Sequence, residues 1–347
     1  MDIDPQQVRK LLIRGVNWVG DALMTTPALA GIRRTFPHAR ISLLVKPRVE
    51  AVFRYNANVD QILSYESKGR HKGFAGLLAL AAALRRERFD LAILLQNAFQ
   101  AALLARMAGI PHRVGYSAQG RGWLLSRAVP VESKAGRHQV DYYRDLLKGL
   151  GWDPGERCLN MPIGPEAEAK AAELIEGAGS PYNAMLFGLN PAATYGPAKR
   201  WFPGRFALLA DRLVGQWDSY VVLTGTTEDR KVTQEVQRAV TRQDRVIDLS
   251  GQTDLQTLGA LIRRCRLYVT NDTGSMHVAV AVGTPLVAIF GPTDPVETGP
   301  LSSQSRVLRH PVPCSPCHLR ECPIDHRCMR GIDIDGVMTA VTELFAI

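Results

Sequence analysis

The sequence has no apolar run long enough to span a bilayer, and its first twenty residues lack the cleavable apolar core of a signal peptide. Internal repeats and low-complexity tracts are also missing. We therefore expect a soluble protein of the cytoplasm. A hydrophobic content of 46% and a charged content of 22% agree with this class, and 347 residues predict two domains of similar size.

Common nucleotide-binding and nucleic-acid-binding signatures are absent too. Neither GxGxxG nor GxxxxGK[ST] occurs, so the usual dinucleotide and P-loop sites have no support. No helix-turn-helix, RRM or KH signature is present, which disfavours a nucleic-acid partner.

Positive charge is concentrated in the first half of the chain. Residues 1–160 contain 24 of the 42 lysines and arginines but only 13 of the 33 acidic residues. This half therefore carries a net charge of +11, whereas the remainder carries −2. Such a balance predicts an anionic partner: nucleic acid, an acidic membrane surface or an acidic substrate.

Strands alternate with helices along the chain, which predicts α/β units with parallel, doubly wound sheets. In the first half we expect strands at 10–16, 41–45, 62–65 and 91–95, and helices at 22–35, 47–56, 74–88, 97–108 and 139–150. Residues 151–165, rich in proline, glycine and turn formers, form the predicted linker. After it we expect helices at 166–176, 203–214, 227–240, 255–264 and 337–345, with strands at 184–189, 219–223, near 247 and at 267–270. Two such units predict a cleft between the carboxyl edges of their sheets.

The stretch 268–295, YVTNDTGSMHVAVAVGTPLVAIFGPTDP, predicts a βαβ unit. A strand ends at Thr270, a polar turn and a helix of small residues follow, and a buried strand spans Leu286 to Phe290. The turn is expected at the carboxyl edge of a parallel sheet, where unpaired N–H groups of the helix start favour an anion.

Side chains in this turn fit a ligand site. Asp272 and Thr273 are candidate caps, and Gly274 permits a close approach of the ligand. His277 is predicted to point from the first helical turn toward the same pocket. A capped helix without a ligand is the alternative interpretation.

Three other turns follow predicted strands and carry charge. Asp21 stands at a helix start, where a carboxylate is usually a cap. The segment NPAATYGPAKRW carries Lys199 and Arg200, and a lysine in a loop constrained by proline and glycine is a candidate phosphate ligand. In LTGTTEDR, Glu228 is a candidate acceptor for sugar hydroxyls, with a ligand-free acid at a helix start as the alternative.

Three segments, NWVGDALMTTPAL, YGPAKRWFP and TNDTGSMHVAVAVGTPLVAIFGPTDP, resemble glycosyltransferase family 9, the ADP-heptose:lipopolysaccharide heptosyltransferases of Gram-negative bacteria. The resemblance covers essentially the whole chain and is greater to heptosyltransferase II than to heptosyltransferase I. It implies the GT-B fold: two Rossmann-like domains facing across a cleft, with the acceptor bound by residues 1–160 and the nucleotide sugar by 166–331. The helix in 332–347 is expected to return to the N-terminal domain.

The resemblance also implies roles for individual residues. Asp21 matches the proposed catalytic base, and Lys199 matches the lysine that pairs with the donor diphosphate. The other donor-binding matches are Thr194, Glu228, Asp272, Thr273, Gly274 and His277. Thr194 stands where heptosyltransferase II sequences often have glutamate.

The implied reaction is an inverting transfer of heptose from ADP-L-glycero-β-D-manno-heptose to the inner-core heptose of lipopolysaccharide. A base with an ordinary carboxylate pKa of about 4 is ionised at neutral pH. Lys199 and the helix start at Thr273 would stabilise the departing ADP, so no metal or other cofactor is expected for the chemistry. The expected partners are the nucleotide sugar, the anionic lipopolysaccharide acceptor and the cytoplasmic face of the inner membrane, without nucleic acid. Acceptor specificity is expected in the loops 71–75 and 117–121.

Four of the six cysteines lie in CSPCHLRECPIDHRC: Cys314, Cys317, Cys322 and Cys328. In a cytoplasmic protein this density suggests a structural zinc, although the spacing is tighter than that of common zinc ribbons. Reduced or disulfide-linked cysteines in a loop are the alternative.

Three alternative functions stay open. The first is a family 9 transferase that uses another nucleotide sugar or acceptor, and the second is a non-catalytic protein that binds nucleotide sugars. The presence of both Asp21 and Lys199 argues against the second, because a binding protein needs no base. The third, a metal-dependent nucleic-acid-binding protein, has the least support.

Overall fold

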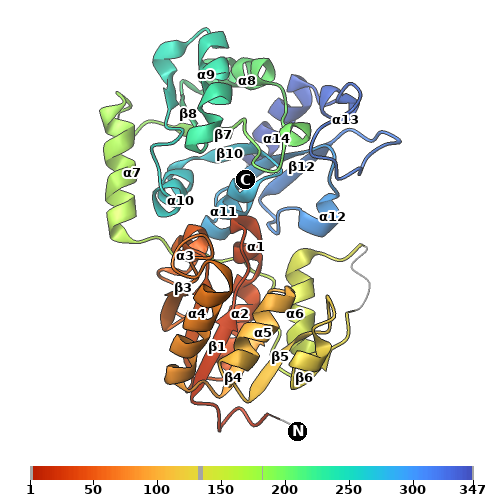
Figure 1. Cartoon of the computed structure of the whole chain (residues 1–347). Coiled ribbons are helices and arrows are strands. Elements are labelled where there is room, and N and C mark those ends of the chain that lie inside the picture. The colour runs from red at the N-terminus through yellow and green to blue at the C-terminus, as the bar shows by residue number, and fades with distance from the viewer. Residues whose placement is uncertain (1–2, 132–135, 182, 346–347) are drawn as a thin grey trace. The chain divides into compact units, whose positions relative to one another are not determined.

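The computed structural model describes residues 3–131, 136–181 and 183–345. The chain divides into two compact units, Met1–Pro162 and Ile163–Ile347. The division falls inside the segment 151–165 that the sequence predicted as a linker. Each unit holds one parallel sheet covered by helices (Figure 1).

The first unit contains a six-stranded parallel sheet with the order β3-β2-β1-β4-β5-β6. Its strands are β1 (Lys10–Arg14), β2 (Arg40–Val45), β3 (Gln61–Ser64), β4 (Leu91–Leu94), β5 (His112–Tyr116) and β6 (Arg127–Val129). Its helices are α1 (Val19–Met24), α2 (Thr26–Thr35), α3 (Pro47–Phe53), α4 (Gly73–Glu87), α5 (Phe99–Met107), η1 (Gly122–Leu124) and α6 (Gln139–Gly149). All four residues of β4 are buried, as expected of a central strand with helices on both faces.

The second unit repeats this topology, with the order β12-β11-β10-β7-β8-β9. Its strands are β7 (Leu186–Asn190), β8 (Tyr220–Leu223), β9 (Val246–Asp248), β10 (Leu267–Asn271), β11 (Leu286–Phe290) and β12 (Ser305–Arg309). Its helices are α7 (Pro165–Gly177), η2 (Pro197–Lys199), α8 (Pro203–Trp217), η3 (Thr227–Asp229), α9 (Arg230–Ala239), η4 (Gln243–Arg245), α10 (Leu255–Arg264), α11 (Gly274–Val282), α12 (Pro295–Thr298), α13 (Arg327–Arg330) and α14 (Ile334–Phe345). Read from β9 to β12, the second sheet has its third, second, first, fourth, fifth and sixth strands in that order, as the first sheet does from β3 to β6. The prediction of two doubly wound parallel sheets is therefore confirmed.

The structure corrects two predicted elements in the first unit. The predicted helix 22–35 is two helices, α1 and α2, separated at Thr25. Pro27 lies at the start of α2 because it has no N–H group to donate and therefore fits best in a first helical turn. The first sheet also has two strands, β5 and β6, beyond the four predicted, and β6 pairs with β5 at the edge of the sheet.

The C-terminal helix α14 contradicts the expectation that residues 332–347 return to the N-terminal domain. It packs against α8 and against β10, β11 and β12 of its own unit. Val337, Val341 and Leu344 are buried in the core on that face of the second sheet. Because its apolar stripe is used to cover this sheet, the helix belongs to the second unit. Over the described residues, no helix is both long and apolar enough to cross a bilayer.

Candidate functional site

The strand order places the candidate ligand-binding edge of the second sheet between β7 and β10. At this pair the chain order reverses, and the loops leaving the two carboxyl ends diverge to opposite faces of the sheet. Asn190 ends β7 and Asn271 ends β10, with Thr270 in register opposite Asn190. The loop after β7 carries Lys199, and the loop after β10 carries Asp272.

A buried ion pair joins these two loops. The Lys199 ammonium donates to Oδ2 of Asp272, and the two side chains are only 11% and 5% exposed. Thr293 donates its hydroxyl to the same Asp272 oxygen at 2.6 Å. The Lys199 ammonium also lies 4.8 Å from the centroid of the Tyr195 ring. These contacts fix one cation at the carboxyl edge of the sheet.

Two asparagines hold the loops around the ion pair. The Asn271 side chain accepts from the Trp201 backbone at 2.9 Å and donates to the carbonyls of Pro191 at 3.0 Å and Ala192 at 3.2 Å. Asn190 donates to the Ser275 hydroxyl at 2.8 Å. Because both ends of the 191–200 loop are held in this way, Lys199 has a defined position.

The start of α11 differs from the predicted capped helix. Thr273 is the N-cap residue, but no side chain makes a capping hydrogen bond there. The Asp272 carboxylate binds Lys199 and Thr293 instead. The prediction that Asp272 caps the helix is therefore wrong, and its carboxylate orients the lysine. Gly274 is the first helical residue, and His277 is buried in the first turn.

The cysteine-rich segment 314–328 makes hydrogen bonds to the loop that carries Lys199. The Arg320 carbonyl accepts from the Ala198 backbone at 3.0 Å, and the Tyr195 hydroxyl donates to the His318 carbonyl at 2.8 Å. A Cβ on Gly196 would lie 2.4 Å from the Arg320 oxygen, so only glycine fits this approach without movement of the backbone.

The same segment also contacts the loop that carries Thr293. Ser315 donates its hydroxyl to the Gly291 carbonyl at 2.5 Å, and the His318 backbone donates to the Pro292 carbonyl at 2.8 Å. The segment therefore joins both loops that position the Lys199–Asp272 pair. The sequence analysis considered only the cysteines of this segment and did not identify the two loops that it contacts.

The cysteines themselves are free thiols. Burial raises the pKa of the Cys328 thiol, a backbone hydrogen bond at Met329 opposes this, and Cys314, Cys322 and Cys317 raise it further, which places the four in one neighbourhood. Within residues 3–131, 136–181 and 183–345, no group of three or more His, Cys, Asp or Glu side chains could hold a metal ion. The zinc hypothesis thus gains no support here.

Two predicted donor ligands lie at the periphery of the loops. Thr194 is exposed. Glu228 is also exposed, and hydrogen bonds from its own backbone N–H and from Thr226 lower its pKa. The neighbouring Asp229, which the sequence did not single out, is buried, and its carboxylate lies 4.0 Å from the Arg200 guanidinium.

In the first unit, Asp21 lies in the first turn of α1, directly after the loop that follows β1. A carboxylate is electrostatically favoured at this end of a helix. Its side chain is half-buried, and its charge adds to the effect of burial in raising the pKa of Tyr143. The carboxylate therefore lies close to the buried Tyr143 of α6.

The loop 117–121, predicted to carry acceptor specificity, contains a structural arginine. Arg121 is fully buried, and burial lowers its pKa to about 10 despite the opposing effect of Tyr142. Its guanidinium donates to the carbonyls of Tyr116 and Gln96 and, at 3.0 Å, to the Asn97 side chain. It holds the loop that leaves β4 and is unsuited to direct recognition of an acceptor.

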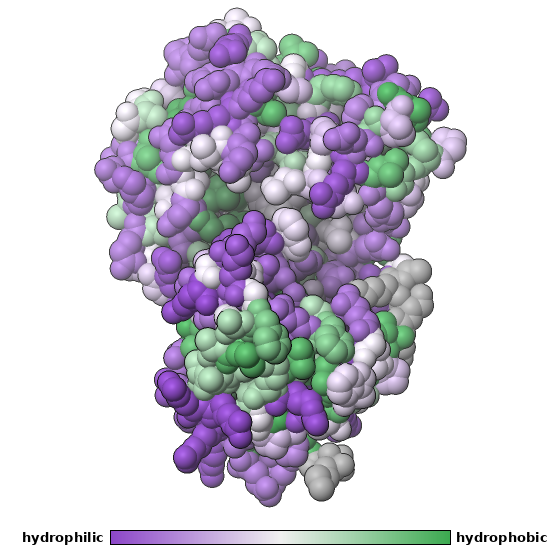
Figure 2. Space-filling model, viewed as in Figure 1, coloured by the Kyte–Doolittle hydropathy of each residue, from purple (hydrophilic) through white to green (hydrophobic). Residues whose placement is uncertain are grey.

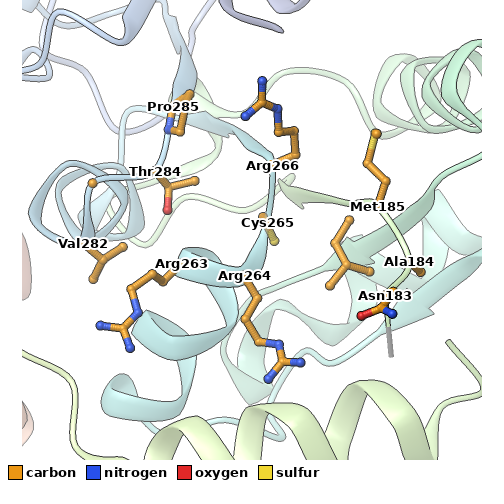
Figure 3. Close-up of a pocket in the computed structure, with 12 residues that line it drawn as sticks. Asn183, Ala184, Met185, Arg263, Arg264, Cys265, Arg266, Val282, Thr284 and Pro285 are labelled. Atoms are coloured by element: carbon orange, nitrogen blue, oxygen red, sulfur yellow. The ribbon is translucent and has the colours of Figure 1, made fainter. Parts of the chain in front are cut away.

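A pocket of about 430 Å³ lies at the opposite, amino-terminal edge of the second sheet, beside Asn183, Met185 and the end of α10 (Figure 3). Arg263 and Arg266 extend in different directions there (Figure 3). Arg263 binds Glu168, and Arg266 lies 5.0 Å from the Phe345 ring centroid. These cations therefore do not converge on one ligand, and the pocket is not the candidate site.

Comparisons with known proteins agree with this geometry. Residues 77–327 match the family model for glycosyltransferase family 9 (heptosyltransferase). Lipopolysaccharide heptosyltransferase 2 of Salmonella typhimurium is 31% identical over 306 residues, which cover 86% of this chain and 88% of that relative.

Two solved structures align over nearly the whole chain. E. coli ADP-heptose lps heptosyltransferase II aligns with a TM-score of 0.81 at 28% identity, covering 97% of this chain and 98% of that one. A family 9 glycosyltransferase from Veillonella parvula aligns with a TM-score of 0.90 at 27% identity, covering 100% and 99%. The predicted GT-B fold is confirmed. The chain belongs to glycosyltransferase family 9.

Proposed function

We propose that this enzyme transfers heptose, with inversion, from ADP-L-glycero-β-D-manno-heptose to the inner-core heptose of lipopolysaccharide. The observation that carries the proposal is the buried Lys199–Asp272 pair beside the start of α11. Heptosyltransferase II relatives support the choice of donor and acceptor. The second unit binds the donor, and the first unit binds the acceptor.

The donor diphosphate binds at the carboxyl edge of the second sheet. Asp272 orients the Lys199 ammonium, whose remaining N–H groups donate to phosphate oxygens. The start of α11 adds backbone N–H groups and the positive end of a helix dipole. Both act most strongly on the charge that develops as ADP departs, which is how they lower the barrier without a metal ion.

The acceptor hydroxyl is activated by Asp21 in the first unit. As the hydroxyl oxygen bonds to the anomeric carbon, its proton passes to the Asp21 carboxylate. The bond from that carbon to the ADP oxygen breaks, and ADP leaves with the electron pair. Attack from the face opposite ADP inverts the anomeric centre.

The exposed face of α4 supports peripheral contact with an acidic membrane. Phe74 is 69% exposed and Leu78 is 45% exposed. Ala75, Ala79, Ala82 and Ala83 are also exposed on this helix, and Figure 2 shows apolar surface over α4 and α5. Basic residues flank the helix, with Lys72 before it and Arg86 in its last turn. An apolar face with basic ends suits the cytoplasmic surface of an inner membrane.

The nearest alternative is a family 9 transferase with another sugar or acceptor. Lys199 and the α11 start would serve any nucleoside diphosphate sugar, so they do not select the heptose. A non-catalytic nucleotide-sugar-binding protein is the other alternative, and Asp21 is the residue that distinguishes it.

Asp21→Asn is expected to abolish transfer while donor binding stays unchanged, because the amide accepts no proton at neutral pH. The test is transfer from ADP-heptose to a mono-heptosylated Kdo2-lipid A acceptor, with ADP-heptose affinity measured on the same preparation. We expect a loss of at least about 100-fold in rate. Transfer by the variant at the wild-type rate would rule Asp21 out as the base.

Lys199→Ala is expected to weaken ADP binding about 10- to 100-fold, since a hydrogen bond to a charged group contributes about 1.5–3 kcal/mol. Calorimetric titration with ADP measures the change, and circular dichroism checks the fold. Lys231→Ala, which removes the same charge from an exposed position on α9, is the control and should bind ADP normally. Tight ADP binding by the Lys199 variant would contradict the phosphate role.

Gly196→Ala is expected to weaken ADP binding at least about tenfold, because the new methyl group would meet the Arg320 carbonyl and displace the Lys199 loop. Gly204→Ala is the matched control, since a Cβ there has no neighbour within 4 Å. Equal ADP affinities of the two variants would mean that the cysteine-rich segment does not position Lys199.

Phe74→Ser/Leu78→Ser is expected to reduce binding to phosphatidylglycerol vesicles at least about tenfold, because each apolar side chain contributes about 1.5–3 kcal/mol when buried. Co-sedimentation measures the change. Leu208→Ser, at a 56% exposed position on α8, should bind like wild type. Undiminished binding of the double variant would exclude α4 as the contact surface.

A further inference from the structure

A second polar pocket, of about 240 Å³, lies at the carboxyl edge of the first sheet. Its lining residues come from the carboxyl ends of four neighbouring strands, from the loops that follow them and from the starts of α4 and α5: Arg14, Asn17, Lys46, Tyr65, Ser67, His71, Gly73, Gln96 and Gln100. The pocket therefore lies at the point where the first sheet reverses its strand order, between β1 and β4. Its volume corresponds to roughly eight water molecules at about 30 Å³ each, which is more than a single ion needs.

Arg14 is the buried cation of this pocket. Only 3% of the residue is exposed, and burial lowers its pKa to about 10, which still leaves it charged at neutral pH. Its guanidinium donates to the carbonyls of Gly15 at 2.5 Å and Leu44 at 3.1 Å, and it lies 5.1 Å from the Tyr65 ring centroid. These contacts orient the guanidinium but supply no opposite charge.

Lys46 adds a second positive charge. Partial burial lowers its pKa, and the charges of Arg48, Arg14 and Lys68 lower it further. The three charged groups that lower this pKa are all cations. A lysine held among like charges gains more from an anionic ligand than one that already has a carboxylate partner.

His71 contributes a neutral donor. Burial and the charge of Arg70 lower its pKa against the opposing charge of Glu66, and its Nδ1 accepts the Glu66 backbone N–H at 3.0 Å. The neutral ring therefore carries its proton on Nε2. Glu66 itself binds Arg70 at 3.1 Å.

The residues that line the pocket include no aspartate or glutamate. A buried arginine and a lysine in one small polar pocket, with hydroxyl and amide groups around them, have the chemistry that recognises an oxyanion. Gly73 on the rim is the first residue of α4, whose next residue is the exposed Phe74. The pocket thus opens beside the surface proposed to contact the membrane.

We propose that this pocket, through Arg14 and Lys46, binds an acidic substituent of the acceptor saccharide, a carboxylate or a phosphate, and so selects and orients the acceptor. The inference rests on the proposed function, because it assumes that the first unit binds the acceptor. It assigns to Lys46 a role in acceptor specificity and not in the transfer step.

The test compares Lys46→Ala with wild type in steady-state transfer and in equilibrium binding of the acceptor alone. Lys46 makes no capping bond at the start of α3, so its truncation should not disturb the fold. We expect the acceptor KM and the acceptor Kd to rise about 10- to 100-fold, with the donor KM within about twofold of wild type. Arg9→Ala is the control, because it removes an exposed cation that precedes β1 at the opposite edge of the first sheet, and it should change none of these values.

Acceptor analogues identify the group that is bound. One analogue has its carboxylates reduced to alcohols, and the other has its phosphates removed. Wild type should lose the same 10- to 100-fold on the analogue that lacks the recognised group, and Lys46→Ala should lose nothing further on that analogue. A loss by Lys46→Ala that is equal on charged and neutral acceptors would overturn the inference.

Different outcomes contradict the pocket inference and the proposed function. Equal acceptor binding by wild type and Lys46→Ala overturns the pocket inference and leaves the proposed function standing. Acceptor binding that depends on Lys46, without any transfer of heptose by wild type, overturns the proposed function and leaves the pocket standing.

Discussion

The buried pair of Lys199 and Asp272 is the interaction on which the candidate site depends. An ion pair of this kind loses the hydration of both charges, so it persists only where further hydrogen bonds support it. Thr293 supplies one of these bonds, and Asn271 fixes the backbone on either side of the lysine loop. The pair also explains why α11 begins without a side-chain cap, because the carboxylate next to its N-cap is used by the lysine.

The cysteine-rich segment belongs to the same unit of structure. Its backbone at His318 and Arg320 contacts the loop before Lys199, and its Ser315 and His318 contact the loop before Thr293. The two partners of Asp272 are thus set by one segment that supplies no charge to the pair itself. The segment therefore positions the loops that carry the functional side chains, and it takes no part in the ion pair itself.

The sequence was most informative where the physical signal is local. The βαβ unit at 268–295 could be predicted because its strands are continuous apolar runs and its turn is polar. Edge strands such as β12 escaped notice, because five partly exposed residues carry neither an apolar run nor a clear alternation. Asp272 was placed correctly but given the wrong partner. Lys199 is 73 positions away in the chain, so no local sequence pattern shows whether the Asp272 carboxylate caps the helix or pairs with a lysine.

The apolar outer face of α4 has a consequence for kinetics. If the enzyme rests on the bilayer through Phe74 and Leu78, as proposed, it would meet an acceptor anchored in the same bilayer by lateral diffusion in two dimensions. The quantity that saturates such an enzyme is the number of acceptors per unit of membrane area. Diluting vesicles at constant lipid composition would then leave the rate of the bound enzyme unchanged, whereas diluting the acceptor within the lipid would lower it.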